Sequence, residues 1–301
     1  MTGDAVTGPY VVGIGGGHGL AATLRAARLY AGRVSAVVTV ADDGGSSGRL
    51  TRELGIPPPG DIRNCLVALS DRDQIKEMFQ HRFESGPLTG HTIGNLIIAS
   101  LTEMKGDFAE AVASAADLLS ARGEVFPATT RLVRLGARTS GGDIKGQVAV
   151  AQTTAPIEAV YLDPPDTPAH EPAVAAIRGA DQVVLGPGSV FTSLIATLSV
   201  PGIGAAVRET SARRVFVCNS RMQKGETEGM NASALLGALL AHAGPGCVDS
   251  VVVQAPSLPG DGVEADLEGL RSLGVDVIPA DVANPDGGHD PERLAEALRR
   301  A

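Results

Sequence analysis

Tyr10-Val-Val-Gly-Ile-Gly-Gly-Gly-His-Gly-Leu20 is the stretch that decides the fold of this chain of 301 residues. It opens with an apolar run typical of a buried strand, and a segment with helical periodicity follows the glycines, from about Leu20 to Tyr30. A strand that passes through a short glycine-rich loop into a helix is the first half of a β-α-β unit. The stretch therefore predicts a sheet whose first strand begins at Tyr10.

The rest of the chain repeats this alternation of strand and helix. Further strands are expected over residues 34–40, 182–185, 214–218, 250–254 and 275–279, and helices over 63–69, 73–82, 92–103, 108–120 and 291–300. The first four of these helices form a block too long for one crossover, so we expect them to cap one end of the sheet. The pattern predicts an α/β fold: a doubly wound, mostly parallel Rossmann-like sheet with helices on both faces.

Residues 125–162 break the alternation. Shorter alternating runs with Gly-Gly and Pro interruptions predict a small antiparallel hairpin insert there. The proline-rich connector at 164–168 is stiff, and nothing around it has the composition of a flexible linker. We therefore expect one nucleotide-binding domain over residues 1–301, with the insert inside it.

Composition narrows the classes of function. The net charge of −9 argues against a general nucleic-acid binder, which would carry a basic face. The chain has no Trp, three Tyr and six Phe, too few for a platform that stacks single-stranded bases. Residues 1–9 lack the pattern of a signal peptide, and no apolar run reaches the ~18 to 20 residues of a membrane span. We expect a cytoplasmic protein with no nucleic-acid partner and no membrane span.

No catalytic or metal-binding constellation stands out. Cys65, Cys218 and Cys247 are too few and too far apart for a disulfide framework or a zinc site, and we expect buried, reduced thiols. The six His are scattered without metal-ligand spacing, and neither a Cys-His pair nor a G-x-S-x-G motif occurs. Catalytic residues and metal ligands therefore stay unassigned.

The first candidate phosphate site is the loop made of Gly15, Gly16, Gly17, His18 and Gly19. Glycines let a backbone approach a phosphate, and a helix N-terminus offers free N–H groups and a positive dipole end. The spacing is neither the dinucleotide fingerprint nor a P-loop, since the third glycine is missing and no Lys-Ser or Lys-Thr follows. A tight turn without a ligand is the alternative. Four glycines in five residues favour contact with a phosphate or diphosphate.

The second candidate segment runs from Asp42 to Arg49, at the carboxyl end of the second strand. Ligands of open parallel sheets bind at such strand ends. Asp42 and Asp43 could hold ribose hydroxyls or a Mg²⁺ ion, and Ser46 and Ser47 could hold oxygen atoms. A solvated turn is the alternative, because Asp, Gly and Ser are the usual turn residues.

Two further segments precede predicted helices. Asp61 follows three prolines and is placed to cap the next helix, while Arg63 and Asn64 in its first turn could reach a phosphate or a base. His91 stands near the start of another helix, where one hydrogen bond would explain it. Asn95 lies within an apolar helix, and a buried amide needs partners.

The last two candidates also follow strand ends. Gly186, Gly188 and Ser189 join a strand to a helix where a diphosphate could rest, although Ser189 alone could cap that helix. Asn219 comes directly after another strand and could read a base edge. Because all of these loops follow the carboxyl ends of strands, we expect them to converge on one cleft. They favour a binding site more strongly than a reaction.

Together these motifs resemble the YvcK-type branch of the CofD family, also called the gluconeogenesis factor family. The resemblance rests on Gly15-Gly-Gly-x-Gly-Leu20, Val38-Thr-Val-Ala-Asp-Asp-Gly-Gly-Ser-Ser-Gly-Arg-Leu50, Pro58-Pro-Gly-Asp-Ile-Arg-Asn64, Gly90-His-Thr-Ile-Gly-Asn95 and Gly186-Pro-Gly-Ser189. It runs in order from about residue 10 to the last helix, and the segment around Asp42 is its most specific part.

The resemblance implies a nucleotide site on a Rossmann-like sheet. Members of the YvcK-type branch bind UDP-sugars such as UDP-N-acetylglucosamine, have no established reaction and are linked to cell shape and peptidoglycan synthesis. We therefore expect a UDP-sugar-binding regulatory protein that links carbon metabolism to cell-wall synthesis, with cell-wall synthesis proteins as partners and a homo-oligomeric state. The transferase branch implies an alternative: Mg²⁺-dependent transfer of a phospholactyl group from a guanosine diphosphate carrier to a deazaflavin.

The resemblance also implies a ligand shell. Carried over by position, it comprises the first glycine loop, the loop at 186–189, Asp42, Asp43, Arg63, Asn64, Asn95 and Asn219. This chain departs from the pattern at two positions. His18 stands where Thr is common, and Gly288 stands where similar proteins often carry Arg. The second departure leaves the choice of ligand, uridine or guanosine, open.

Overall fold

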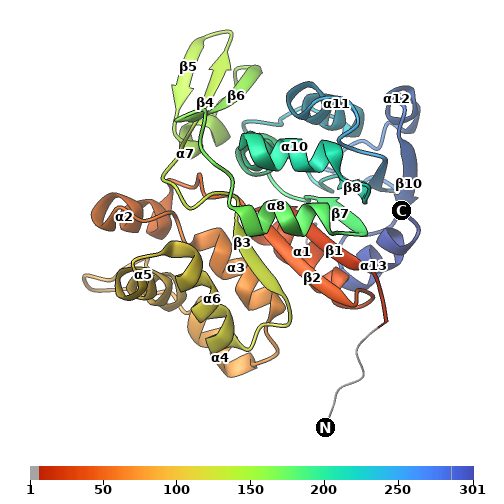
Figure 1. The fold of residues 1–301 in the computed structure, drawn as a ribbon. Helices are drawn as coiled ribbons and strands as arrows, with labels where there is room; N and C mark the ends of the chain where they lie inside the picture. The colour runs from red at the N-terminus through yellow and green to blue at the C-terminus, as the bar shows by residue number, and fades with distance from the viewer. Residues whose placement is uncertain (1–6, 286) are drawn as a thin grey trace.

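A seven-stranded sheet forms the centre of the protein (Figure 1). The computed structural model describes residues 7–285 and 287–301. In order across the sheet, the strands are β10 (Asp276–Ala280), β9 (Ser250–Gln254), β8 (Arg213–Val217), β7 (Gln182–Leu185), β1 (Tyr10–Gly15), β2 (Arg33–Val38) and β3 (Glu124–Pro127). Every neighbouring pair runs parallel, so the predicted α/β fold with a Rossmann-like sheet is confirmed.

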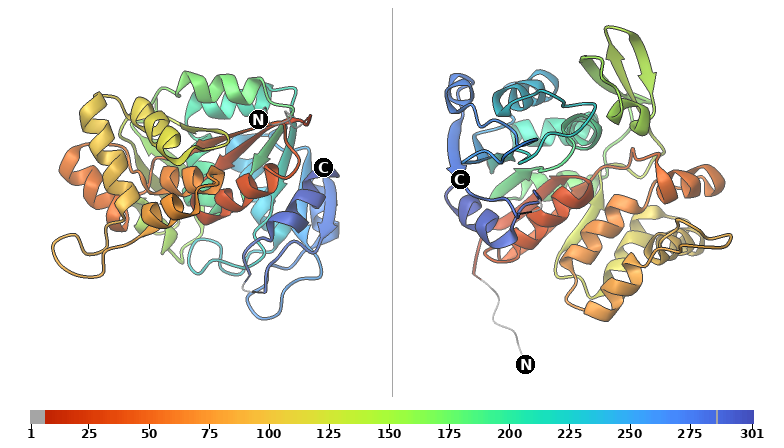
Figure 2. Two further views of the ribbon diagram at one scale, coloured as in Figure 1. Left: turned by 90° about the horizontal axis from the view of Figure 1, so that it is seen from below. Right: turned by 180° about the vertical axis from the view of Figure 1, so that it is seen from behind.

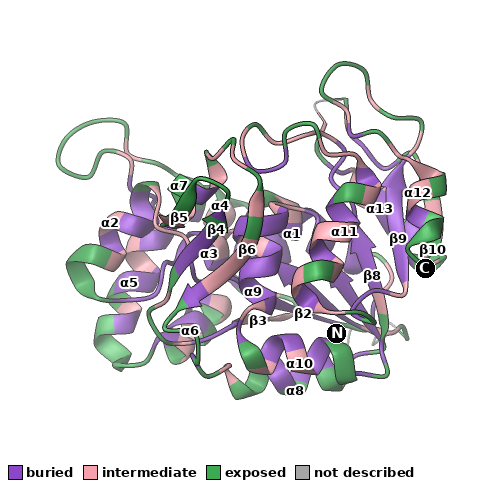
Figure 3. Ribbon diagram, turned by 90° about the horizontal axis from the view of Figure 1, so that it is seen from above, coloured by how far each residue is buried: buried purple, intermediate pink, exposed green. Residues whose placement is uncertain are grey.

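The central strands are buried on both sides, as Figure 3 shows by colour. Strands covered on both faces are near-continuous apolar runs, because both sets of alternating side chains enter a core. In β1, Val12 and Ile14 join one apolar cluster and Val11 joins the other. The two clusters are the cores on the two faces of the sheet.

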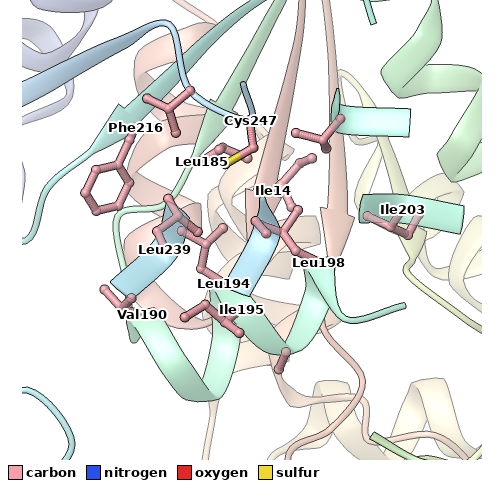
Figure 4. Packing of buried hydrophobic residues seen from close by; sticks show 14 of the residues in the cluster. Ile14, Leu185, Val190, Leu194, Ile195, Leu198, Ile203, Phe216, Leu239 and Cys247 are labelled. Atoms are coloured by element: carbon pink, nitrogen blue, oxygen red, sulfur yellow. The ribbon is translucent and has the colours of Figure 1, made fainter. Parts of the chain in front are cut away.

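Helices cover both faces. One face carries α1 (Gly17–Ala27), α3 (Gly60–Leu69) and α13 (Pro291–Arg299); the other carries α8 (Glu171–Arg178), the π-helical η1 (Val190–Ile195) with α9 (Ala196–Leu198), α10 (Pro201–Glu209) and α11 (Ala232–Ala243). Figure 4 shows Leu194 and Ile195 of η1 packed near Ile14, Leu185 and Leu239. The short helix α12 (Leu267–Ser272) packs against α11 and β10. The three cysteines are buried and unpaired, as predicted.

The predicted helical block gathers at one end of the sheet, beside β3 (Figures 1 and 2). It comprises α3, which packs against β2 and β3, together with α4 (Asp73–Gln80), α5 (Ile93–Lys105) and α6 (Phe108–Leu119). A further helix, α2 (Gly45–Leu54), packs against α5 and was not predicted, because its segment was interpreted as a loop. The Thr92 and Asp107 side chains cap the starts of α5 and α6, and glycine at 106 ends α5 in the left-handed region.

The predicted antiparallel insert is confirmed, and with three strands it is larger than a single hairpin. Its strands are β4 (Arg134–Thr139), β5 (Gly142–Lys145) and β6 (Ile157–Asp163), in the order β5-β4-β6, and the short helix α7 (Gln147–Ala151) connects β5 to β6. The range predicted for the insert, 125–162, also included β3, which pairs with β2 in the main sheet. Because β3 is an edge strand with alternating burial, its sequence has the pattern of an antiparallel strand.

Residues that were expected in loops lie in the first turns of three helices. α1 begins at Gly17, so His18 and Gly19 are helical, and α2 begins at Gly45, so Ser46 and Ser47 lie in its first turn. α3 begins at Gly60, which places Asp61 inside the first turn and not at the predicted cap. A first turn tolerates these residues because its N–H groups have no partners within the helix.

No single helix among residues 7–285 and 287–301 is long and apolar enough to cross a membrane. One pair, η1–α9 together with α10, reaches the required length and composition only as two halves bent by 81°.

Candidate functional site

The strand order reverses between β1 and β7. The chain continues from β1 to β2 and β3 on one side, whereas β7 begins the series that runs to β10 on the other side. In open α/β sheets, ligands bind in the crevice that such a reversal leaves at the carboxyl ends of the strands. Residues 15–19 follow β1 and residues 186–189 follow β7, so the two predicted phosphate loops lie side by side at this crevice.

The two loops touch through their backbones. A Cβ atom on Gly19 would lie 2.2 Å from the Pro187 carbonyl oxygen, so only glycine fits at this position. The Thr23 hydroxyl donates a hydrogen bond of 2.7 Å to the Gly186 carbonyl oxygen. Gly16 precedes the first turn of α1 and supplies no side chain to cap it. The close approach of the loops thus leaves a helix N-terminus at the crevice, which favours an anion.

A pocket of about 190 Å³ opens beside these loops. Its lining includes His18, Gly19, Pro187, Gly188, Asn219, Arg221, Gly288 and His289. The Asn219 Oδ1 atom accepts a hydrogen bond of 2.9 Å from the Gly188 N–H group, which ties the end of β8 to the second glycine loop. The structure therefore brings the two glycine loops, Asn219 and the Gly288 segment to one pocket.

His289 is a pocket residue to which the sequence assigned no role. Its ring is buried, and Nε2 lies 3.2 Å from the Cys218 carbonyl oxygen, so this nitrogen donates the hydrogen bond. Burial lowers the pKa of His289 to about 4. The imidazole is therefore neutral at pH 7 and contributes a fixed polar group, not a positive charge. Its position next to Gly288 was the only signal in the sequence.

Asp61 lies beneath the first glycine loop. The residue is half-buried, and its carboxyl group accepts a hydrogen bond from the Gly17 N–H group in the first turn of α1. Burial, followed by the neighbouring Asp42 carboxylate, raises the pKa of Asp61 to about 7. Strongly shifted carboxyl groups in clefts are concentrated at functional sites.

The two acids of the most specific segment have different surroundings. Asp42 Oδ1 accepts a hydrogen bond of 3.0 Å from the Gly44 N–H group, Ser47 also bonds to this carboxylate, and burial raises the Asp42 pKa. Both oxygens of Asp43 are used within the protein, because they accept hydrogen bonds of 3.0 Å from the Gln147 and Val148 N–H groups of α7. Both acids therefore make contacts within the protein, Asp43 through both of its oxygens.

A second pocket, of about 570 Å³, lies beside these acids. Its lining includes Asp42, Asp43, Arg52, Arg134, Lys145 and Asp163. It shares no lining residue with the pocket at Asn219. The predicted site residues that line these pockets thus form two sets, one at each pocket.

The other predicted residues form a buried polar network that joins α2, α3 and α5. Ser46 Oγ lies 3.0 Å from His91 Nδ1 and accepts a 3.0 Å bond from Asn95 Nδ2. Arg63 donates to Asn95 Oδ1 at 3.0 Å and to Asn64 Oδ1 at 2.7 Å. Burial lowers the pKa of His91. These contacts satisfy the polar groups internally and explain the buried amide.

Arg63 is the charged member of that network. It is 7% exposed and forms no ion pair with a described residue, and its Nε atom has no partner in the part of the chain that the structure describes. Burial lowers the pKa of its guanidinium, with the nearby Arg82 acting in the same direction. Asp61 is near enough to interact with it electrostatically, although the two side chains form no ion pair.

Glu226 is a second residue to which the sequence assigned no role. The Ser189 hydroxyl donates a hydrogen bond to Glu226 Oε1, and the Ser189 and Thr192 hydroxyls lie 2.5 Å apart. Glu226 is 8% exposed, and burial raises the pKa of its carboxyl group. Its only sequence signal is a Glu between Gly and Thr in a loop just past a strand end.

Carboxylate side chains are also candidate ligands for a metal ion. Among residues 7–285 and 287–301, no group of three or more His, Cys, Asp or Glu side chains is arranged to hold one. Mg²⁺ is commonly bound by one or two carboxylates together with substrate phosphates. Asp42 and Asp61, which interact electrostatically, fit that smaller requirement.

Comparison with known proteins places this geometry in a family. The family model described as 2-phospho-L-lactate transferase CofD matches residues 11–283. A protein named gluconeogenesis factor from Halalkalibacterium halodurans is 43% identical, over 89% of this chain and 88% of its own length. The gluconeogenesis factor of Bacillus subtilis is 39% identical, over 96% and 97% of the two chains.

A solved structure agrees with these matches. The crystal structure of a UPF0052 family member from Bacillus halodurans has a TM-score of 0.94 and 39% sequence identity, and the comparison covers 97% of this chain and 99% of that chain. The sequence match, the shared fold and the loops at the strand reversal all point to the same group. The chain belongs to the CofD family, in its gluconeogenesis factor branch.

Proposed function

We propose that this protein binds a UDP-sugar, UDP-N-acetylglucosamine, at the crevice between β1 and β7, and that it does so as a cytoplasmic regulator. The observation that carries the proposal is the contact of two glycine loops at the reversal of strand order, next to the N-terminus of α1. Such a place supplies backbone N–H groups to a diphosphate, which suits a chain whose net charge is −9.

In this proposal the ligand lies across the two glycine loops and the pocket at Asn219. Residues 15–19 and 188–189 hold the diphosphate, and the pocket at Asn219 and His289 takes the nucleoside, where amide and imidazole groups can pair with the polar edge of a base. Gly288 lines that pocket at a position where similar proteins often carry Arg. The smaller residue leaves more room in the pocket, and we expect this to affect which nucleotide binds.

The regulatory role rests on the relatives. Proteins at about 40% identity over nearly the whole chain carry the name gluconeogenesis factor. We propose that this protein, like them in sequence, links carbon metabolism to cell-wall synthesis and cell shape through its ligand, with cell-wall synthesis proteins as partners and a second copy of itself in a homo-oligomer.

A second candidate function is CofD-type group transfer. The observation that favours it is the pair Asp42 and Asp61, whose carboxyl groups interact electrostatically and whose pKa values are both raised by burial. These residues would hold Mg²⁺, which when bound supplies positive charge to the phosphates of a nucleotide diphosphate carrier. A deazaflavin acceptor would then occupy the 570 Å³ pocket beside them.

A thermal-shift panel separates the two functions. The ligands are UDP-N-acetylglucosamine, UDP-glucose, GDP and NAD, each with and without Mg²⁺. A ligand at about 100 times its dissociation constant adds roughly 2.7 kcal/mol to the free energy of unfolding, a shift of several degrees. A shift confined to UDP-sugars and indifferent to Mg²⁺ supports the regulator. A Mg²⁺-dependent shift with GDP supports the transferase, and no shift with any UDP-sugar would refute the first proposal.

A further inference from the structure

Helix α7 of the insert is held at both ends by residues from the candidate site. It has five residues, fewer than an isolated helix needs for stability in water. It packs against η1, and its Val150 side chain is fully buried in the same core cluster as Val190 and Phe191. Its position therefore depends on contacts outside the insert.

The N-terminal end is fixed by Asp43. Both carboxylate oxygens accept hydrogen bonds of 3.0 Å from the first two N–H groups of the helix, where a negative charge is also favoured by the helix dipole. A Cβ atom on Gly146, which precedes the helix, would lie 2.5 Å from Asp43 Oδ2. The Asp43 carboxylate therefore occupies the space that a side chain at position 146 would need.

The C-terminal end is fixed by residues 225–226. The Glu226 N–H group donates a 3.3 Å bond to the Ala151 carbonyl oxygen, and a Cβ atom on Gly225 would lie 2.3 Å from that same oxygen. Gly225 also has a φ of +92°, which favours glycine. Through its side chain, Glu226 accepts the Ser189 hydroxyl of the second glycine loop.

We propose that Asp43 and Glu226 are positioning residues that fasten α7 between the two halves of the site, so that α7 couples the Asp42 segment to the Ser189 loop. Asp43 joins α7 to the end of β2, and Glu226 joins it to the end of β7. Neither residue needs to touch a ligand for this role, which goes beyond the proposed function and relies on it only for the affinity measurement below.

The coupling extends into the three-stranded sheet. The Gly146 N–H group donates a 2.7 Å bond to the Leu135 carbonyl oxygen of β4, and α7 continues directly from β5. A shift of α7 therefore moves the insert, which projects from one corner of the protein (Figure 1). The insert thereby reports whether the site is occupied.

The variants Asp43→Asn, Glu226→Ala and the double variant test this proposal. Asn can accept at only one atom, so Asp43→Asn loses one of the two N–H contacts, and Glu226→Ala removes the acceptor of the Ser189 hydroxyl while its backbone bond to α7 stays. Glu228→Ala is the matched control, since Glu228 is exposed and lies two residues along the same loop. Amide hydrogen exchange of residues 134–163 is measured without ligand, and UDP-N-acetylglucosamine affinity by calorimetry.

Each single variant should speed exchange in α7 and the insert by about tenfold and weaken binding by about tenfold, while the control matches wild type. The double variant should lose about tenfold in affinity instead of about a hundredfold, because the loss of either link already uncouples α7 from one half of the site. Multiplicative losses, or exchange in the insert that neither variant changes, would overturn the coupling. The exchange result stands even if the protein binds no UDP-sugar, so failure of the proposed function is distinguishable.

Discussion

Gly19 is the residue where the two glycine loops meet, and its missing side chain is what allows the contact. A Cβ atom at position 19 would lie 2.2 Å from the Pro187 carbonyl oxygen. Moving a flexible side chain cannot relieve this overlap, because the oxygen belongs to the backbone. The sequence showed the glycines but could not show which of them needs to be glycine, since that depends on Pro187, 168 residues later. Predictions at this scale concern single atoms.

Gly19→Ala should destabilise the protein by about 3 kcal/mol, since the loops must separate, and should abolish nucleotide binding. Urea unfolding and a ligand titration measure the two effects. Gly237→Ala is the control, because Gly237 lies in α11 with nothing within 4 Å of an added Cβ atom. It should stabilise α11 by up to about 1 kcal/mol. Equal stabilities of the two variants would contradict the close contact.

Asp61→Asn should flatten the dependence of stability on pH. The folded-state pKa of Asp61, about 7, lies above its unfolded value, so the proton bound by the folded state stabilises it below about pH 4. That stability is lost as pH rises through 7. At pH 8 the variant should therefore be more stable than wild type, by on the order of 2–4 kcal/mol.

Thermal unfolding from pH 4 to pH 8 measures this difference. Asp117→Asn is the control, because the Asp117 side chain is exposed on α6. Its profile should run parallel to that of wild type. If the Asp61→Asn profile is also parallel to wild type, the carboxyl group does not have the raised pKa.

At the scale of elements, α2, α3 and α5 are joined by the network of Ser46, Arg63 and Asn95. Each helix contributes a polar residue to the network, and the bonds from Asn95 to Ser46 and from Arg63 to Asn95 join different helices. The sequence predicted that Asn95 needs partners, but it could not name them, because Ser46 and Arg63 come from other helices. The sequence also predicted a loop at Ser46, because glycine and serine are typical of turns. The structure places Ser46 in the first turn of α2.

Asn95→Ala should destabilise the protein by about 2 kcal/mol, because Arg63 and the Ser46 hydroxyl each lose a buried hydrogen-bond partner. Denaturant unfolding measures the change. Ser100→Ala, at an exposed position of the same helix, should stay within about 0.5 kcal/mol of wild type. Comparable losses in both variants would show that α5, and not the network, is the source of the effect.

At the scale of the whole molecule, the site follows from strand order. Alternating strands and helices in the sequence predicted a parallel sheet, and the strands at 182–185 and 250–254 were predicted to the residue. The pairing of β1 with β7 joins segments that are far apart in the sequence, so no local pattern predicts it. The edge position of β3 and the contact of α7 with Asp43 also depend on residues far apart in the sequence. For this reason the insert was predicted too long and the bonds from α7 to Asp43 were not predicted.

The central claim, a nucleotide diphosphate sugar bound at the reversal between β1 and β7, is tested most directly by calorimetric titration with UDP-N-acetylglucosamine of wild type, Asn219→Asp and Gln74→Glu. Asp at 219 keeps the acceptor for the Gly188 N–H group but adds a charge beside the diphosphate, worth about 3 kcal/mol or a hundredfold in affinity. Gln74→Glu adds the same charge at an exposed position of α4. We predict 1:1 binding to wild type and Gln74→Glu and about a hundredfold weaker binding to Asn219→Asp. No binding to wild type, or equal affinities of all three proteins, would contradict the account.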